Sequence, residues 1–252
     1  MPPTQRGYKS TGPPSYYLPP AVKWLLIVNA ALYVVDFIGQ AWFGAVLFEP
    51  FYLVPAQVLM HGRIWQLVTY MFLHSVVVYH VLFNMLCLWL FGMDLERAWG
   101  TARFLRYYFL CGVGAGVCVV LVALLRPIDM DLATLGASGA VLGLLLAYGV
   151  MYPDRIILFM LIFPLKAKYV AMICGAIAFF GSWQGGSGVS HVAHLGGMVV
   201  GYIYLKTRLK VTLPGPFATL RRQFRNWRTE RARRKFQVYL RKRGPGGDGW
   251  VN

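Results

Sequence analysis

The stretch "TLGASGAVLGLLLAYG", residues 134–149, places a single serine at the head of an apolar run rich in glycine and alanine. This serine, Ser138, has Gly136 two positions before it and Gly139 directly after it. A serine in such a run is usually structural, because its hydroxyl can hydrogen-bond to a carbonyl one turn earlier. A functional role for Ser138 therefore requires a partner for this hydroxyl elsewhere in the chain.

The composition places most of the chain in a membrane. Of its 252 residues, 58% are apolar and only 13% are charged, whereas a soluble domain carries roughly a quarter charged residues. Six apolar segments of about 17–22 residues are each long enough for a helix to cross a bilayer. They are residues 22–40, 76–94, 104–125, 136–152, 167–183 and 190–208. The sequence predicts an all-α polytopic membrane protein with six transmembrane helices.

The regions around these segments suggest three parts of the chain. Residues 1–20 are rich in Pro, Ser, Thr and Tyr and are predicted to be a disordered tail. Residues 21–209 would form the six-span domain, and residues 210–252 a basic tail. Within the domain, residues 41–75 mix aromatic and polar side chains, which favours a loop lying on the membrane over a seventh span.

The positive charge is concentrated at one end of the chain. Fourteen of the 25 Lys and Arg lie from Lys206 onward, and the net charge is +16. A basic tail beside a membrane suits anionic headgroups better than nucleic acid. It is equally compatible with an amphipathic helix on the inner leaflet and with a solvated tail. Lys and Arg in the short loops favour cytoplasmic N- and C-termini by the positive-inside rule, and we expect a bacterial plasma membrane.

Polar side chains recur near one end of alternate spans. His80 and Asn84 are four residues apart in the second span and therefore share a helix face. Ser138 lies at the start of the fourth span, and His194 lies near the start of the sixth. Because alternate spans run in the same direction, these side chains should lie at one depth near the outer surface. Polar groups at such depth are costly and therefore indicate a functional site.

Small residues could bring the fourth and sixth spans together. Glycines spaced by four form one ridge on each span and allow close backbone approach. These glycines are Gly139 and Gly143 on the fourth span and Gly197 and Gly201 on the sixth. The second pair shares a helix face with His194. A serine hydroxyl beside an imidazole is the minimum for an activated nucleophile; the alternative is a back-bonded Ser138 with a purely structural His194.

In this order, the motifs "HVLFN", "GASG" and "AHLGGMVVG" resemble the rhomboid family of intramembrane serine proteases. The resemblance covers about 180 residues, from near Trp24 to Arg208. It implies a six-helix bundle with a membrane-lying first outer loop, and cleavage of transmembrane protein substrates near the outer face of the membrane. Residue by residue, it implies the following roles: Ser138 as nucleophile, His194 as general base, and His80 and Asn84, with the backbone N–H of Ser138, as oxyanion stabilisers.

Two further segments bear on this resemblance. Residues 184–190 match the position of the family's mobile gate. Family members often have Trp-Arg where this chain has Trp65 and Gln66. This departure removes the arginine that would anchor the outer loop, but it does not affect the catalytic pair.

The remaining titratable residues favour a dyad without metal or cofactor. Asp94, Glu96 and Asp154 lie toward the inner side, at the wrong depth to orient the base as in a triad. His191 and His194 form His-x-x-His, but two histidines without a third ligand are weak evidence for zinc. The four cysteines show no CxxC spacing and are predicted to be small buried hydrophobes.

Two alternative functions, each from a different class of protein, are also considered. A proteolytically silent relative could bind the spans of client proteins, but it would typically lack Ser138 or His194. A transporter would distribute polar groups through both leaflets, whereas the inner halves of the second, fourth and sixth spans are almost purely apolar. The sequence does not indicate an oligomeric state or a particular substrate.

Overall fold

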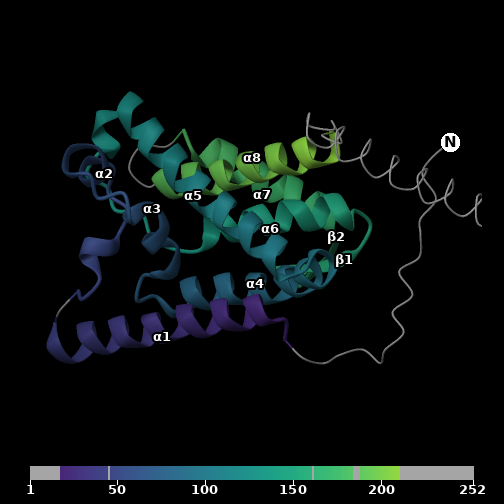
Figure 1. The fold of residues 1–252 in the computed structure, drawn as a ribbon, viewed down its shortest axis with the longest axis horizontal. Coiled ribbons are helices and arrows are strands. Elements are labelled where there is room, and N and C mark those ends of the chain that lie inside the picture. Colours follow the sequence, from purple (N-terminus) through teal and green to yellow (C-terminus); the bar gives the residue numbers. More distant parts are fainter. Residues whose placement is uncertain (1–17, 45, 161, 184–187, 211–252) are drawn as a thin grey trace, which may run out of the picture. The chain divides into compact units, whose positions relative to one another are not determined.

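The computed structural model describes residues 18–44, 46–160, 162–183 and 188–210 (Figure 1). The chain divides into a unit of residues 1–205, which holds the helical bundle, and a unit of residues 206–252. Residues 1–17 of the predicted N-terminal tail, almost all of the basic C-terminal tail and most of the predicted gate lie outside the described residues.

Six helices occupy the positions of the six predicted spans (Figure 1). They are α1 (Pro20–Phe43), α4 (Val78–Trp99), α5 (Thr101–Leu125), α6 (Ser138–Met151), α7 (Ala167–Gly181) and α8 (Gly188–Lys210). Among the described residues, α1, α4 and α5 are long and apolar enough to cross a membrane, whereas α6 and α7 are shorter apolar helices. The chain is thus mostly helical with three membrane-capable helices, and the count of six crossings stays a prediction.

The segment between α1 and α4 forms short helices. These are η1 (Glu49–Phe51), α2 (Pro55–His61), α3 (Gln66–Thr69) and η2 (Tyr70–Phe72). Leu53 and Thr134 form an isolated antiparallel bridge, in which the Leu53 N–H donates to the Thr134 carbonyl at 3.0 Å and the reverse bond is 2.8 Å. The Gly136 N–H donates to the Tyr70 carbonyl at 2.9 Å. These bonds tie the segment to the residues directly before α6.

The prediction of an all-α fold is wrong between α6 and α7. There β1 (Ile156–Phe159) and β2 (Phe163–Lys166) pair antiparallel, with Ile156 opposite Lys166 and Phe159 opposite Phe163. Isoleucine and phenylalanine favour strands, and a proline such as Pro164 is tolerated in an edge strand. The continuous apolar run does not distinguish a strand from a helix by its periodicity, so the sequence pattern could not reveal this hairpin.

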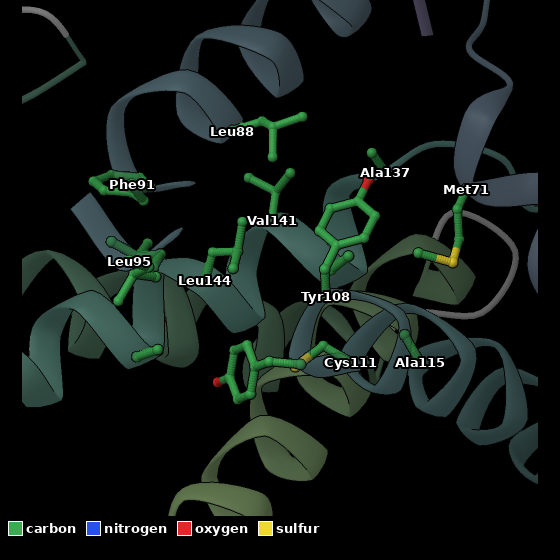
Figure 2. Close-up of a cluster of buried hydrophobic side chains, with 14 of the residues drawn as sticks. Met71, Leu88, Phe91, Leu95, Tyr108, Cys111, Ala115, Ala137, Val141 and Leu144 are labelled. Atoms are coloured by element: carbon green, nitrogen blue, oxygen red, sulfur yellow. The ribbon is translucent and has the colours of Figure 1, made fainter. Parts of the chain in front are cut away.

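The core surrounds α6, which packs against α4, α5 and α7. Nine of its 14 residues are buried, as expected for a helix that is apolar on every side. Figure 2 shows Val141 and Leu144 of α6 close to Leu88 of α4, with Cys111 of α5 beyond them. This arrangement holds the N-terminal end of α6, where Ser138 lies, within the packed bundle.

The start of α1 is capped by a side chain of α4. Glu96 is 3% exposed, and its two carboxylate oxygens accept hydrogen bonds from the backbone N–H groups of Ala21 and Val22 at 3.0 and 2.8 Å. The first N–H groups of a helix have no partner within it and attract negative charge. Glu96 therefore fixes the register of α1 against α4.

Candidate active site

Ser138 and His194 are brought together across the bundle. Ser138 is the first residue of α6, and its Oγ lies 2.7 Å from Nε2 of His194 on α8. Both side chains are half-buried. This is hydrogen-bond distance for a hydroxyl and an imidazole, so the Ser138 hydroxyl has a partner outside its own helix.

Backbone contact between α6 and α8 makes this approach possible. A Cβ added at Gly197 would overlap the carbonyl of Gly139, and a Cβ at Gly139 would lie 3.2 Å from the Ala193 carbonyl oxygen. Only helices with glycine at the contact can pack so closely.

The other two ridge glycines also contact α5. A Cβ at Gly143 would lie 2.6 Å from Cys111 Sγ and 3.3 Å from the Gly197 carbonyl oxygen. A Cβ at Gly201 would lie 2.5 Å from the Tyr107 hydroxyl and 3.0 Å from Cys111 Sγ, both on α5. Gly201 therefore lies against α5, whereas the sequence predicted a contact toward the fourth span.

His80 lies beside the turn that leads into α6. Gly136 has a φ of +119°, and a Cβ there would be 3.0 Å from His80 Nε2 and 3.9 Å from Ser138 Oγ. The other ring nitrogen of His80, Nδ1, lies 3.0 Å from Ser75 Oγ. When the Ser75 hydroxyl donates to Nδ1, the proton of the neutral ring is on Nε2, the nitrogen nearest to the Ser138 region.

Asn84 is buried one turn further along α4. Its Nδ2 donates to the His80 carbonyl at 2.8 Å, and the residue is 5% exposed. This bond within α4 holds the Asn84 amide on the same face of the helix as His80. The described hydrogen bonds do not include one between Asn84 and Ser138.

The side chains of Ser138, His194, His80 and Asn84 all line one cavity of about 550 Å³. Its walls come from α4, α6, α7 and α8, with most of the lining apolar. Among the lining residues of α4 and α7 are Cys87, Cys174, Ile177 and Ala178. A cavity of this size can hold a drug-sized ligand.

His191 lies beside His194 and lines the same cavity. Its ring is 5.9 Å from the His194 ring and nearly perpendicular to it. A Cβ at Gly181 would be 2.5–2.7 Å from the His191 ring atoms, so this ring packs tightly against α7. Among the described residues, no group of three or more His, Cys, Asp or Glu could hold a metal ion.

The carboxylates with described partners are engaged away from Ser138. Glu96 caps α1, Asp94 pairs with Arg155, and Asp154 lies 3.1 Å from both Lys166 and Lys168. Asp129 pairs with Arg126 at 3.0 Å, and Asp36 accepts from Gln40 at 2.9 Å. None of these pairs includes a histidine of the cavity.

His74 is a buried histidine in the segment before α4. It is 2% exposed, and its ring centroid lies 5.3 Å from that of His80 in an edge-on arrangement. Burial first, and the neighbouring His80 second, lower the pKa of His74 to about 4. His74 is therefore neutral in the folded protein near pH 7, with its ring packed edge-on against that of His80.

Gln66 anchors the outer segment in place of an arginine. It is fully buried, and its Nε2 donates to the Pro50 carbonyl at 3.1 Å and to Gln57 Oε1 at 2.6 Å, while its Oε1 accepts from the Val54 N–H at 3.1 Å. Arg63 Nη1 also donates to Gln57 Oε1, at 2.9 Å. An amide both donates and accepts, so Gln66 satisfies a backbone N–H that an arginine could not.

Comparison with known proteins identifies the family of the chain. Residues 61–211 match the model of the Rhomboid domain. The chain is 30% identical over 179 residues to rhomboid protease AarA of Providencia stuartii, covering 62% of each protein. It is 31% identical over 147 residues to the putative rhomboid protease YdcA of Bacillus subtilis, covering 57% of this chain and 66% of the relative.

A third relative is much longer than the region that it shares with this chain. Rhomboid-like protease 5 of Toxoplasma gondii is 30% identical over 148 residues, which cover 57% of this chain and 16% of that protein. The chain thus spans less than two thirds of the length of these relatives. The domain match covers more than half of the chain, and together with the apolar helices it shows that this is a multi-pass membrane protein that belongs to the rhomboid family.

Proposed function

We propose that the protein is an intramembrane serine endopeptidase that uses Ser138 and His194 as a catalytic dyad. The observation that carries the proposal is the 2.7 Å separation of Ser138 Oγ and His194 Nε2 inside an apolar helical bundle. Serine needs an adjacent base to act as a nucleophile. The names of the relatives, which are rhomboid proteases, support the same reaction class.

In this reaction the Ser138 hydroxyl attacks the scissile carbonyl carbon while its proton passes to His194 Nε2. The protonated imidazole then gives that proton to the leaving amine, and an acyl-enzyme on Ser138 remains. Water attacks the ester with His194 again acting as base, which releases the second product and restores the serine. A carboxylate partner for His194 is not required, and the carboxylates with described partners are engaged elsewhere.

The oxyanion would be stabilised at the head of α6. The backbone N–H of Ser138 lies at the N-terminus of that helix, where N–H groups lack partners within the helix and the helix dipole favours negative charge. The Nε2 of His80 and the amide of Asn84 would supply further donors. Removing one such donor typically lowers the rate by about 10²–10³.

The substrate is proposed to be the span of another membrane protein. Lining from α4 and α7 gives the cavity apolar walls, which suit a segment leaving lipid. By the positive-inside rule the dyad would lie toward the outer face, with both termini cytoplasmic. No nucleic acid or cofactor enters this scheme. The relatives include bacterial and mitochondrial proteins, so the bacterial plasma membrane stays a prediction from the sequence.

A serine-directed fluorophosphonate probe tests the dyad directly. The purified full chain would be labelled in bilayers beside Ser138→Ala, His194→Ala and His191→Ala, with thermal unfolding measured for each. We expect labelling to be lost in the first two variants and kept in the third. A folded parent protein that does not label would favour the client-binding alternative, and loss of labelling only in His191→Ala would assign the base to the other histidine.

A further inference from the structure

The β1–β2 hairpin leaves an apolar face uncovered. Ile156 and Leu158 lie on the same face and are 66% and 59% exposed, and Pro164, which pairs with Leu158, is also exposed there. On the other side, Ile157, Phe159 and Leu165 pack against the core. Such an alternation would normally place polar residues on the outer face, so the uncovered face indicates a second apolar environment.

The backbone of the hairpin limits where that environment can be. The described sheet has two strands, so each strand has one edge without a partner strand. Open sheet edges are not found in the hydrocarbon region, because their N–H and C=O groups need hydrogen bonds. A continuous apolar face is equally unfavourable in water. The boundary between acyl chains and headgroups satisfies both requirements.

Charged and aromatic side chains flank the hairpin as expected at such a boundary. Lys166 Nζ and Lys168 Nζ both lie 3.1 Å from Asp154 Oδ1, so two ammonium groups share one carboxylate and leave a net positive charge. Lys168 also lies over the ring of Tyr169, 5.3 Å from its centroid. Tyrosine and lysine are typical of membrane interfaces, and net positive charge favours anionic headgroups.

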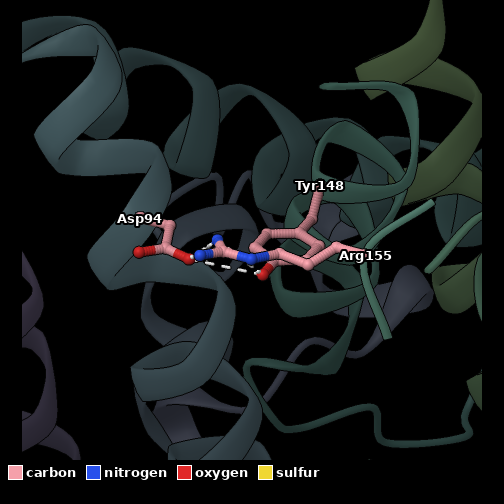
Figure 3. A network of polar contacts seen from close by, with 3 residues as sticks. All are labelled: Asp94, Tyr148 and Arg155. Carbon is pink, nitrogen blue, oxygen red and sulfur yellow. Dashed lines mark hydrogen bonds and ion pairs between the residues drawn. The ribbon is translucent and has the colours of Figure 1, made fainter. Parts of the chain in front are cut away.

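The root of the hairpin is fixed to the helices. Arg155, directly before β1, pairs with Asp94 of α4, and its Nη1 lies 3.2 Å from the hydroxyl of Tyr148 on α6 (Figure 3). The Tyr148 hydroxyl in turn donates to Asp94 at 3.3 Å. The position of the hairpin is therefore coupled to the positions of α4 and α6, the helices that carry His80 and Ser138.

The two helices joined by the hairpin are short. The 14 and 15 residues of α6 and α7 span about 21 and 22 Å at about 1.5 Å per residue, compared with about 30 Å of hydrocarbon. With the hairpin end of α6 at one boundary, Ser138 at the other end would lie about 9 Å below the opposite boundary. The depth of Ser138 is independent of proteolysis. Only its effect on substrate cleavage rests on the proposed function.

We propose that the β1–β2 hairpin is a membrane anchor that binds the acyl–headgroup boundary of an anionic phospholipid leaflet through its uncovered apolar face and its flanking lysines. The anchor sets the depth of α6 from the end opposite Ser138.

Spin-label accessibility tests the anchor in the full chain. The four native cysteines would be replaced by alanine, and a nitroxide would be attached through Ile156→Cys or Leu158→Cys. The protein would then be placed in phosphatidylcholine vesicles with or without phosphatidylglycerol. Val34→Cys, on the exposed side of α1 at 50% exposure, is the matched lipid-facing control. Collision rates with oxygen, which enriches in acyl chains, and with a water-soluble nickel complex give the depth of each label.

We expect the hairpin labels to collide more with oxygen than with nickel, at a depth between that of Val34 and bulk water. Phosphatidylglycerol should move them deeper, and Lys166→Ala with Lys168→Ala should abolish that shift. Labels that collide mainly with nickel would overturn the anchor. Labels shielded from both reagents would also overturn the anchor, because a protein surface would then cover the hairpin. Spin–spin broadening would identify that surface as a second copy of the chain, and its absence would identify another protein surface. Fluorophosphonate labelling of the same samples reports the proposed protease separately.

Discussion

Gly197 of α8 lies directly against the carbonyl of Gly139 in α6, without room for a methyl group between the two backbones. Gly139 follows Ser138, and Gly197 follows His194 by three residues. The helix contact and the 2.7 Å contact between Ser138 and His194 are thus parts of one interface. The distance between nucleophile and base depends on how closely two helix backbones can approach.

Gly197→Ala should separate the dyad. The new methyl would overlap the Gly139 carbonyl, which is backbone and cannot rotate away, and overpacking of this kind costs about 1–3 kcal/mol. We expect a lower unfolding temperature and at least about 10-fold slower fluorophosphonate labelling, because a longer contact weakens the activation of Ser138. Gly175→Ala on α7 is the control, since its methyl would meet only Met198, at 3.4 Å or beyond. If Gly197→Ala were labelled at the normal rate, the activation of Ser138 would not depend on the close contact of α6 and α8.

Gly136→Ala should impair the site more than the fold. Its φ of +119° is unfavourable for alanine, and the methyl would lie 3.0 Å from His80 Nε2. Gly62→Ala is the matched control, because Gly62 also has a positive φ, +66°, but has nothing within 4 Å of an added Cβ. Both variants should lose about 1–3 kcal/mol of stability. Only Gly136→Ala should lose labelling of Ser138, and equal labelling of the two would show that His80 needs no such space.

The features that could be predicted from the sequence are those that depend on composition and on the spacing of residues along the chain. Six apolar runs predicted the positions of α1 and α4–α8, because a helix in lipid needs a long apolar run. Ser138 and His194 could be paired in advance because topology places the starts of alternate spans at one level. The order of three short motifs was enough to predict the family, which the domain match confirms.

The parts that could not be predicted depend on tertiary contacts. The run around Ile156 reads equally well as helix or strand, and its pairing as a hairpin is decided by the turn and by packing on α7. Gln66 differs from the family's common arginine, and only the positions of the Pro50 carbonyl and the Val54 N–H show that an amide fits there. The burial of His74 likewise has no signature in the local sequence.

Ser75→Ala should slow the reaction through His80. Without the Ser75 hydroxyl 3.0 Å from Nδ1, the neutral ring is free to place its proton on Nδ1, and Nε2 then cannot donate to an oxyanion. We expect kcat/KM to fall about 10-fold, less than the about 10²–10³ for direct loss of a donor, with unfolding unchanged. Ser75→Thr should restore the rate because it keeps the hydroxyl. Ser182→Ala, which removes an exposed hydroxyl bonded to the Phe179 carbonyl, is the control.

Gln66→Leu should loosen the outer segment. The substitution keeps a similar volume but leaves the Val54 N–H without its partner, and an unsatisfied buried group costs about 1–3 kcal/mol. The Pro50 carbonyl and Gln57 Oε1 each lose one of two donors and keep Trp65 and Arg63. We expect a clearly lower unfolding temperature. Gln66→Arg should not rescue stability, because an arginine cannot accept from Val54 and would bring a second cation to the oxygen already bound by Arg63. Full stability of Gln66→Arg would contradict this account.

His74 should make the fold less stable in mild acid. Its pKa in the folded protein is about 4, below the ordinary value of 6.5, so between these two values the unfolded chain binds a proton that the folded protein does not. Stability is therefore complete above about pH 7 and falls as the pH drops from about 6.5 to about 4, by at most about 3 kcal/mol from this residue. Unfolding of the full chain in detergent between pH 4.5 and 7.5 would measure the slope.

The matched variants for this slope are His74→Phe and His61→Phe. Phenylalanine keeps an aromatic ring edge-on to His80 and removes the titration, so the slope should flatten in His74→Phe. His61 is exposed at the end of α2, and its replacement should leave the slope as in the parent protein. His80, His191 and His194 remain in both variants, so the difference between the two slopes belongs to His74. Equal slopes would show that the unfolded chain gains no proton at this position that the folded protein lacks, and His74 would then be charged beside His80.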